Sequence, residues 1–185
     1  MSATTAVTTP VPTGTWNVDP AHSRVEFQVK HLGIATVRGH FAEFEGTLDV
    51  SEDLSAATAR GLVKVASVNT NEEKRDDHLR SPDFFDAEQY EHISFESKAI
   101  VPVDEDEFEI TGDLTLHGVT REITLRAEVT GTEEDPWGNE RVGLEVTGHL
   151  NRGDYGMTFN QALGSGNMLV SDRVKLALDI SAVRQ

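Results

Sequence analysis

Hydrophobic and polar residues alternate with a period of two along most of the chain. Between residues 24 and 31, Val25, Phe27 and Val29 share one side, while polar and charged residues occupy the other. Successive side chains of a β-strand point to opposite faces, so this pattern is typical of a strand with one buried and one solvated face. The alternation recurs over residues 61–67, 93–101, 108–116, 123–129, 142–150 and 174–180. The pattern therefore predicts about eight antiparallel strands.

The alternation changes phase once within a long stretch, residues 37–50. Val37 and Phe41 occupy odd positions, whereas Phe44 begins a run on even positions. A shift by one residue turns every following side chain to the other face of a sheet unless the strand bulges. We therefore expect a bulge and a bend near Ala42–Glu43 within one long strand.

Two segments lack this period. Residues 70–92 contain Thr70 and Glu73 at the spacing of a capping box, and Pro82 ends the run, so we expect a helical insertion here. Residues 151–172 are rich in Gly and Asn and form a long loop without a sustained period. Long loops inside compact domains usually have a role, such as covering a cavity. We expect both segments to lie near the mouth of the folded sheet.

Strands with one apolar face can pack as a sandwich or close into a barrel. Closure removes exposed edges, and an eight-stranded barrel is either filled by its side chains or holds one small ligand. Small residues occupy many expected inward positions: Gly39, Gly61, Ser67, Ser97, Ala99, Gly112, Ala127 and Gly148. They are compatible with a dry cavity and equally with relief of crowding in a packed barrel. The sequence thus predicts an all-β fold and leaves the filling of its interior open.

The composition narrows the possible functions. The chain has 185 residues, enough for one domain with its own core, and a formal net charge of −16. Such an acidic surface repels nucleic-acid phosphates and anionic lipid headgroups, so we expect no nucleic-acid partner and no stable membrane insertion. The chain has no cysteine, which excludes disulfides, thiolate catalysis and cysteine-ligated metals. No apolar run is long enough to span a bilayer.

The first fifteen residues differ from the rest. Residues 1–15 are rich in Thr, Ala and Pro, carry no basic residue and lack the apolar stretch of a signal peptide. We therefore expect a disordered lead-in over 1–15, a single domain over 16–185 and a cytoplasmic location.

Candidate catalytic and metal-binding residues are few. His78 and Ser81 are three residues apart and would share one helix face, next to Asp77. The segment lacks a nucleophile turn and an oxyanion-hole signature, so we favour a hydrogen-bonding cluster at the mouth over catalysis. None of the seven histidines forms a His-x-His or His-x-x-x-His pair, so we expect no metal site. His31 is expected to point inward at a strand end.

Five motifs, in order along the chain, resemble those of a known family. They are WNVDPAHS (16–23) followed by FQVKHLG (27–33), RDDHLRSPDFFD (75–86), GDLTLHGVT (112–120), NRGDYG (151–156) and VSDRV (170–174). Together they are similar to the YceI-like, polyisoprenoid-binding proteins, with Tyr155 where that family more often has Phe. The resemblance runs from about Trp16 to the C-terminus.

The resemblance implies a lipocalin-like, eight-stranded antiparallel barrel that holds an isoprenoid chain or a similar amphiphile, often as a dimer. We therefore expect a non-enzymatic homodimer that binds, transports or sequesters a long apolar amphiphile and requires no cofactor. The candidate ligands are an isoprenoid quinone, a polyprenyl lipid or a fatty-acid-like molecule.

The expected ligand contacts come from the inward faces and the helical motif. They are Phe27, Val29, His31, Phe41, Val63, Val65, His78, Phe84, Phe85, Phe95, Leu114, Leu125 and Val146. One alternative is an enzyme that acts on an amphiphile at the barrel mouth, with His78 as general base and Asp76 or Asp77 orienting it. Another is a structural dimer whose barrel is packed solid.

Overall fold

The structure is a computed structural model and describes residues 10–185. Within this range one α-helix, α1 (Glu73–Arg80), accompanies a large β-sheet. The strands are β1 (Gly14–Val18), β2 (Arg24–His31), β3 (Ala35–Phe41), β4 (Phe44–Val50), β5 (Thr58–Lys64), β6 (Val68–Asn69), β7 (His92–Pro102), β8 (Glu107–Leu116), β9 (Val119–Glu134), β10 (Glu140–Asn151) and β11 (Val170–Arg184). Short 3₁₀ turns are η1 (Pro20–His22), η2 (Leu54–Ala56), η3 (Val65–Ser67) and η4 (Arg152–Tyr155).

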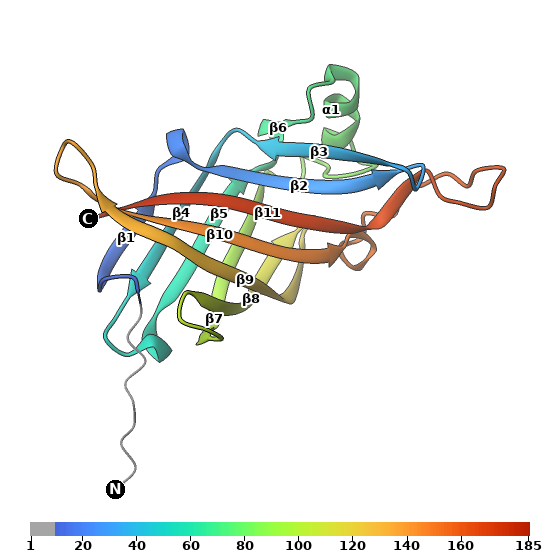
Figure 1. Ribbon diagram of the computed structural model, residues 1–185. Helices are drawn as coiled ribbons and strands as arrows, with labels where there is room; N and C mark the ends of the chain where they lie inside the picture. The colour runs from blue at the N-terminus through green and yellow to red at the C-terminus, as the bar shows by residue number, and fades with distance from the viewer. Residues whose placement is uncertain (1–9) are drawn as a thin grey trace, which may run out of the picture.

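The strands form one closed antiparallel barrel (Figure 1). The order around the sheet is β1-β4-β5-β7-β8-β9-β10-β11-β2-β3-β6, and β1 also pairs with β11 and so closes the sheet. In three places, two short strands that follow each other along the chain together form one long strand of the barrel. The pairs are β1 with β2, β3 with β4 and β5 with β6. For example, β11 pairs with β2 over Val174–Asp179 and with β1 over Ala182–Arg184. Counted as continuous strands, they give the predicted eight-stranded antiparallel barrel.

The predicted bend lies between β3 and β4. The backbone N–H of Ala42 donates to the carbonyl oxygen of Ser67 (3.1 Å), and that of Glu43 donates to the Ser67 hydroxyl oxygen (3.0 Å). The same hydroxyl donates to the carbonyl oxygen of Lys64 (2.6 Å). Ser67, which the alternation predicts as an inward wall residue, therefore fastens the bend.

The prediction of which β7 residues point inward is wrong beyond Ser97. The register with β8 shifts between Ser97 and Ala99, which pair with Gly112 and Thr111. This bulge reverses the phase, so Ile100 lines the interior while Ala99 and Val101 are exposed. The sequence hides the bulge because all three positions carry apolar residues.

The helical insertion is shorter than expected, and its predicted capping box does not form. The N-cap of α1 is Glu72, which makes no side-chain cap bond. Thr70 is buried and donates from its backbone N–H (2.8 Å) and its hydroxyl (2.5 Å) to one carboxylate oxygen of Asp76. Arg75 donates from Nε to the Thr70 hydroxyl oxygen (2.7 Å). Hydrogen bonds among Thr70, Arg75 and Asp76 therefore replace the predicted cap, and residues 81–90 follow as turns.

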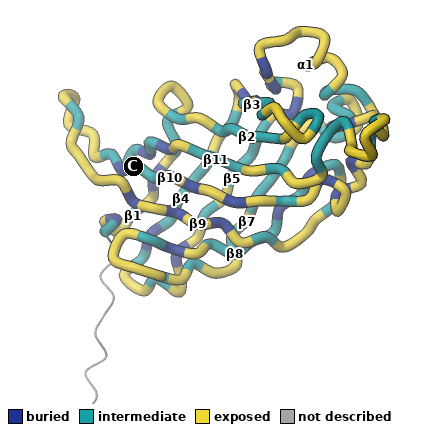
Figure 2. The backbone as a smooth tube through the Cα atoms, turned by 45° about the vertical axis from the view of Figure 1, so that its right-hand side comes forward, coloured by how far each residue is buried: buried dark blue, intermediate teal, exposed yellow. Residues whose placement is uncertain are grey.

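The barrel has two different ends (Figures 1 and 2). We call one the helix end: α1, residues 81–90, η4 and the loop 156–169 lie there. Its buried apolar cluster contains Phe27, Phe41, Val65, Val68, Phe84, Phe85, Leu114, Leu116, Tyr155 and Met157. The other is the N-terminal end, where the chain enters β1. Its cluster contains Val11, Trp16, Val50, Phe108, Val129, Val142, Ile180 and Ala182.

The predicted lead-in over 1–15 is only partly covered by the structure, because residues 1–9 lie outside the described residues. Strand β1 begins at Gly14, and Val11 is buried in the core of the N-terminal end. The ordered part of the chain therefore begins before Trp16. No helix within residues 10–185 has the length and apolar character needed to cross a bilayer.

Candidate ligand-binding cavity

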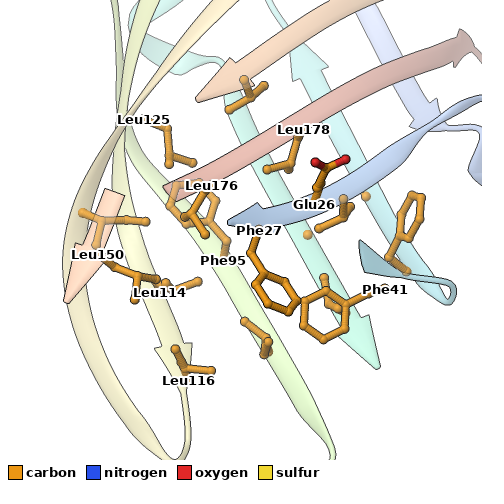
Figure 3. A pocket seen from close by; sticks show the side chains of 18 of the residues that line it. Glu26, Phe27, Phe41, Phe95, Leu114, Leu116, Leu125, Leu150, Leu176 and Leu178 are labelled. Carbon is orange, nitrogen blue, oxygen red and sulfur yellow. The ribbon is translucent and has the colours of Figure 1, made fainter. Parts of the chain in front are cut away.

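A cavity of about 480 Å³ lies inside the barrel and reaches the core clusters of both ends. Its volume falls within the range of pockets that hold small ligands. Figure 3 shows part of the wall, where Phe27, Phe95, Leu125 and Leu176 approach one another from different strands. Because the interior is hollow, the alternative of a barrel packed solid is wrong.

The structure places nearly all the predicted contact residues on this cavity. Those that line it are Phe27, Val29, His31, Phe41, Val63, His78, Phe84, Phe85, Phe95, Leu114, Leu125 and Val146. Val65 does not line it, because β5 ends at Lys64 and Val65 lies in η3, buried in the core cluster of the helix end. Whether the lining residues contact a ligand stays a prediction.

Sequence reasoning missed the lining residues that lie outside the alternating runs. They include Val11, Leu79, Arg152, Met157, Phe159 and Leu169. None of them belongs to a run of alternating residues, and periodicity is the only signal by which a single sequence separates inward from outward positions. The NRGDYG motif marks the position of Arg152 but does not reveal that its side chain is buried.

Three of the small inward glycines do not contribute to the hollow. A Cβ on Gly39 would lie 2.4 Å from Cζ of Phe27, one on Gly112 would lie 2.6 Å from Cζ of Phe95, and one on Gly148 would lie 2.5 Å from Cδ2 of Leu125. Large neighbouring side chains thus cover these glycines. Gly61 differs, because its nearest neighbour would be a backbone oxygen at 3.7 Å. Only Gly61 among these four faces open space in the cavity, so the relief-of-crowding interpretation holds for the other three.

Three rings form an aromatic rim at the helix end, which we call the rim cluster: His78, Phe84 and Phe159. Their centroids are 5.0 Å (His78–Phe84), 5.0 Å (His78–Phe159) and 5.2 Å (Phe84–Phe159) apart, all edge to face. Such pairs are the preferred aromatic geometry. His78 lines the cavity while its side chain remains 44% exposed. The cavity therefore meets solvent at the rim cluster.

The hydrogen bonds around His78 do not activate Ser81 as a nucleophile. Its Nε2 lies 2.8 Å from a carboxylate oxygen of Asp83, and not beside Asp76 or Asp77 as expected for the catalytic alternative. Asp76 bonds with Thr70, and Asp77 pairs with Arg80. The Ser81 hydroxyl donates to the carbonyl oxygen of His78 (2.6 Å) rather than to its ring. This part of the motif therefore joins α1 to the following turns, as the hydrogen-bonding interpretation predicts.

Arg152 is the most deeply buried charged residue at the helix end. It follows β10 in η4, is 3% exposed, and lies with its guanidinium 5.9 Å from the centroid of the Phe84 ring. The guanidinium donates to the carbonyl oxygens of Met157 (2.8 Å), Phe159 (2.8 Å), Val170 (3.3 Å) and Ser171 (2.9 Å). Burial lowers the pKa of Arg152, and the Asp172 carboxylate opposes this shift. One side chain thus fixes both ends of the loop over the cavity.

Tyr155 belongs to the core and not to the cavity wall. It is 1% exposed, and its hydroxyl has no hydrogen-bond partner among the described residues. Burial raises the pKa of its phenol. Its carbonyl oxygen lies 2.9 Å from Nδ1 of His117. The ring of Tyr155 therefore packs in the core. Its buried hydroxyl makes no hydrogen bond with the described residues that would offset its removal from water.

The N-terminal end is closed by apolar side chains. Trp16 is fully buried, and its indole N–H donates to the carbonyl oxygen of Pro12 (3.0 Å). Val11, Val50 and Ala57 line this end of the cavity and are nearly inaccessible to solvent. Within residues 10–185, no three His, Asp or Glu side chains come together in a way that could hold a metal ion.

A family model described as YceI-like domain matches residues 16–182. A UPF0312 protein of Staphylococcus aureus is 39% identical over 159 residues, which cover 85% of this chain and 90% of the relative. The region matched by the family model includes the five motifs and nearly the whole barrel.

Solved structures share the fold. BcnA of Burkholderia cenocepacia has a TM-score of 0.76 at 22% identity and covers 89% of this chain and 98% of its own. The YCEI protein of Campylobacter jejuni has a TM-score of 0.72 at 30% identity and covers 84% of this chain and 90% of its own. A polyisoprenoid binding domain from Saccharophagus degradans has a TM-score of 0.71 at 18% identity and covers 92% of this chain and 98% of its own.

Proposed function

The chain belongs to the family of YceI-like domains, and we propose that it binds the long apolar chain of an isoprenoid lipid inside its barrel and carries or sequesters it without chemical change. The observation that carries this proposal is the 480 Å³ cavity, whose wall consists almost entirely of apolar side chains. The name of the Saccharophagus degradans structure, a polyisoprenoid binding domain, supports the choice of ligand.

The energetics agree with such a ligand. Burial of each CH₂ group contributes about 0.8 kcal/mol, so ~10 buried carbons contribute roughly 8 kcal/mol. Loss of rotational and translational freedom offsets much of this gain. Added chain length therefore raises affinity without any polar anchor inside the barrel.

The arrangement of polar groups favours one orientation. Arg75, His78 and Asp83 lie at the helix end, where the cavity meets solvent, whereas the N-terminal end is apolar. A quinone ring or another polar head would remain at the rim cluster while the prenyl chain points towards Trp16. This role needs no cofactor. The homodimer, the cytoplasmic location and the quinone or polyprenyl identity of the ligand stay predictions.

The test starts with protein purified from its own host and analysed by native mass spectrometry, followed by lipid extraction. We expect a bound lipid with a prenyl chain, and we expect delipidated protein to take up farnesol or a menaquinone. Protein that carries no lipid and takes up neither probe would overturn the proposal.

A matched pair of variants on β10 shows whether binding occurs inside the barrel. Leu144 lines the cavity, whereas Thr147 is exposed on the outer face. Leu144→Gln places an amide against the bound chain and should lower affinity by about tenfold or more, because one lost hydrogen bond costs about 1–3 kcal/mol. Thr147→Gln should leave affinity unchanged. Equal affinities for both variants would contradict an internal site.

A further inference from the structure

The N-terminal end of the cavity is closed by a segment that does not belong to the sheet. Residues 10–13 precede β1, and Val11 is 5% exposed and lines the cavity, whereas Pro12 and Thr13 are exposed. Val11 packs within the apolar cluster that contains Trp16 and Ile180. A single side chain of this segment therefore enters the barrel.

The backbone of Gly14 directs the segment to this position. Its φ of +138° lies in a region that residues with a Cβ rarely adopt, and a Cβ there would lie 3.0 Å from Nε of Arg184. Glycine therefore permits both the turn into β1 and the close approach of Arg184. A larger residue at position 14 would move the segment away from the barrel end.

Two side chains hold the backbone of the segment in place. The Trp16 indole N–H donates to the carbonyl oxygen of Pro12 (3.0 Å), and Arg184 donates from Nη2 to that of Thr13. Arg184 is itself fixed by Glu140, with Nη1 and the carboxylate oxygen 2.7 Å apart. The segment is thus tied to β1 and to the last strand, and Val11 has a defined position.

We propose that Val11 is the stop that sets the length of the apolar chain the barrel accepts. This inference rests on the proposed function. A chain that enters at the rim cluster extends through the cavity until its tip reaches Val11. Each isoprene unit up to that point adds buried surface and raises affinity by about tenfold or more. Units beyond it remain outside the barrel and add nothing.

Two truncations and a series of linear prenols test the stop. Removal of residues 1–9 keeps residues 10–13 in the chain, whereas removal of residues 1–13 deletes them. Dissociation constants are measured for geraniol, farnesol, geranylgeraniol and solanesol with delipidated protein. We expect the wild type and the shorter truncation to stop gaining affinity at the same chain length. The longer truncation should continue to gain affinity for at least one further prenol.

Point variants keep the inference testable if the longer truncation does not fold. Val11→Phe enlarges the stop and should move the plateau to a shorter prenol, and Val11→Ala should raise affinity for the prenol just beyond the wild-type plateau. Val101→Phe is the matched control, because Val101 is exposed at the same end and does not line the cavity.

The outcomes separate this inference from the proposed function. Prenol binding with the same plateau in every folded variant overturns the role of Val11 and leaves the proposed function intact. Failure of the wild type to bind any prenol overturns the proposed function together with the stop. A plateau that shifts in opposite directions in Val11→Phe and Val11→Ala supports both.

Discussion

At the N-terminal end of the barrel, the buried cluster consists of apolar side chains such as Trp16, Val142 and Ala182. At the helix end, the buried residues also include Thr70, Asp76 and Arg152, and these are the buried polar residues found within residues 10–185. The difference follows from the backbone. Strands satisfy their own N–H and C=O groups in the ladder, so this end is packed mainly with hydrocarbon. Side chains donate there to the carbonyl oxygens of Pro12 and Thr13, which precede the sheet.

The irregular chain at the helix end has no ladder to satisfy its backbone. Its buried carbonyl oxygens therefore need donors from side chains, and Arg152 supplies four such bonds. At the entry to α1 the Asp76 carboxylate accepts from the backbone N–H and the hydroxyl of Thr70, and Arg75 donates to the Thr70 carbonyl oxygen. Stability at one end should thus depend on packing and at the other on a few polar bonds.

The largest loss of stability is expected at the N-terminal end. Trp16→Ala removes a fully buried ring and should lower the free energy of unfolding by about 3–5 kcal/mol. Trp137→Ala is the matched control, because Trp137 is exposed in the β9–β10 hairpin and should change stability by less than about 0.5 kcal/mol. Urea unfolding measures both, and similar losses would contradict the packing assigned to the N-terminal end.

A slightly smaller loss in the free energy of unfolding is expected at the helix end. Arg152→Ala leaves several buried carbonyl oxygens without donors and should cost about 3 kcal/mol. Arg152→Lys should restore little of it, because one ammonium group cannot reproduce the planar fork of donors. Arg173→Ala, at an exposed arginine in β11, is the control. Full stability of Arg152→Lys in thermal unfolding would show that charge alone holds the loop.

Two glycines of the barrel strands, of which one is covered by its neighbours and one faces the cavity, give the next effect on stability. Gly112→Ala should cost about 1–3 kcal/mol, because the new Cβ would meet the Glu96 carbonyl oxygen at 2.4 Å. Gly61→Ala should be neutral or slightly stabilising, since its Cβ meets only a contact of 3.7 Å. Thermal unfolding of delipidated protein compares the two variants. Equal losses would show that Gly61 does not face open space.

These variants also show where sequence reasoning succeeds. Alternation is a local property of a strand, so the eight strands, the bend at Ala42–Glu43 and the inward positions of Phe27, Phe95 and Leu125 follow from it. The lack of a single period predicts a loop over residues 151–172; the structure has a shorter loop over 156–169, because η4 precedes it and β11 begins at Val170. Local patterns report local geometry well.

The failures share a physical cause, which is that specific contacts outside the repeating pattern decide the local structure. The bulge in β7 follows from pairing with β8, and the phase change is invisible because Ala99 and Val101 are apolar like Ile100. Thr70 bonds Asp76 instead of capping α1. Val11 is buried because Trp16 and Arg184 bind its neighbours, and no periodicity could reveal this.

A small gain in stability is expected at Tyr155. Its buried hydroxyl lacks a hydrogen-bond partner among the described residues, so Tyr155→Phe removes a desolvated polar group and keeps the ring. We expect the free energy of unfolding to rise by about 1 kcal/mol. Tyr90→Phe, at a half-buried ring beside His117, is the control. A loss of stability in Tyr155→Phe would mean that the hydroxyl has a partner in solution, such as a buried water.

The smallest effect is a pH dependence at the outer surface of the N-terminal end. Arg141 donates to Asp135 (2.8 Å) and to Asp19 (2.9 Å), which ties the β9–β10 hairpin to the β1–β2 connection. The bond from Arg141 is the main cause that lowers the pKa of Asp135 to about 2, from an ordinary value of 3.8. A carboxylate with a lowered pKa stabilises the fold above its unfolded pKa and loses this contribution as pH falls towards its folded pKa.

The stabilisation from Asp135 should therefore be complete above about pH 4 and disappear between about pH 4 and pH 2. Asp135→Asn removes this contribution, so the difference in unfolding free energy between wild type and variant should shrink over that window. Glu134→Gln, at an exposed position of the same hairpin, should show no such convergence. Since the contact lies outside the cavity, neither variant should change prenol affinity at neutral pH. A stability difference that stays constant from pH 5 to pH 2 would show that Asp135 acts through its hydrogen bonds to Trp137 and Asn139 and not through its charge.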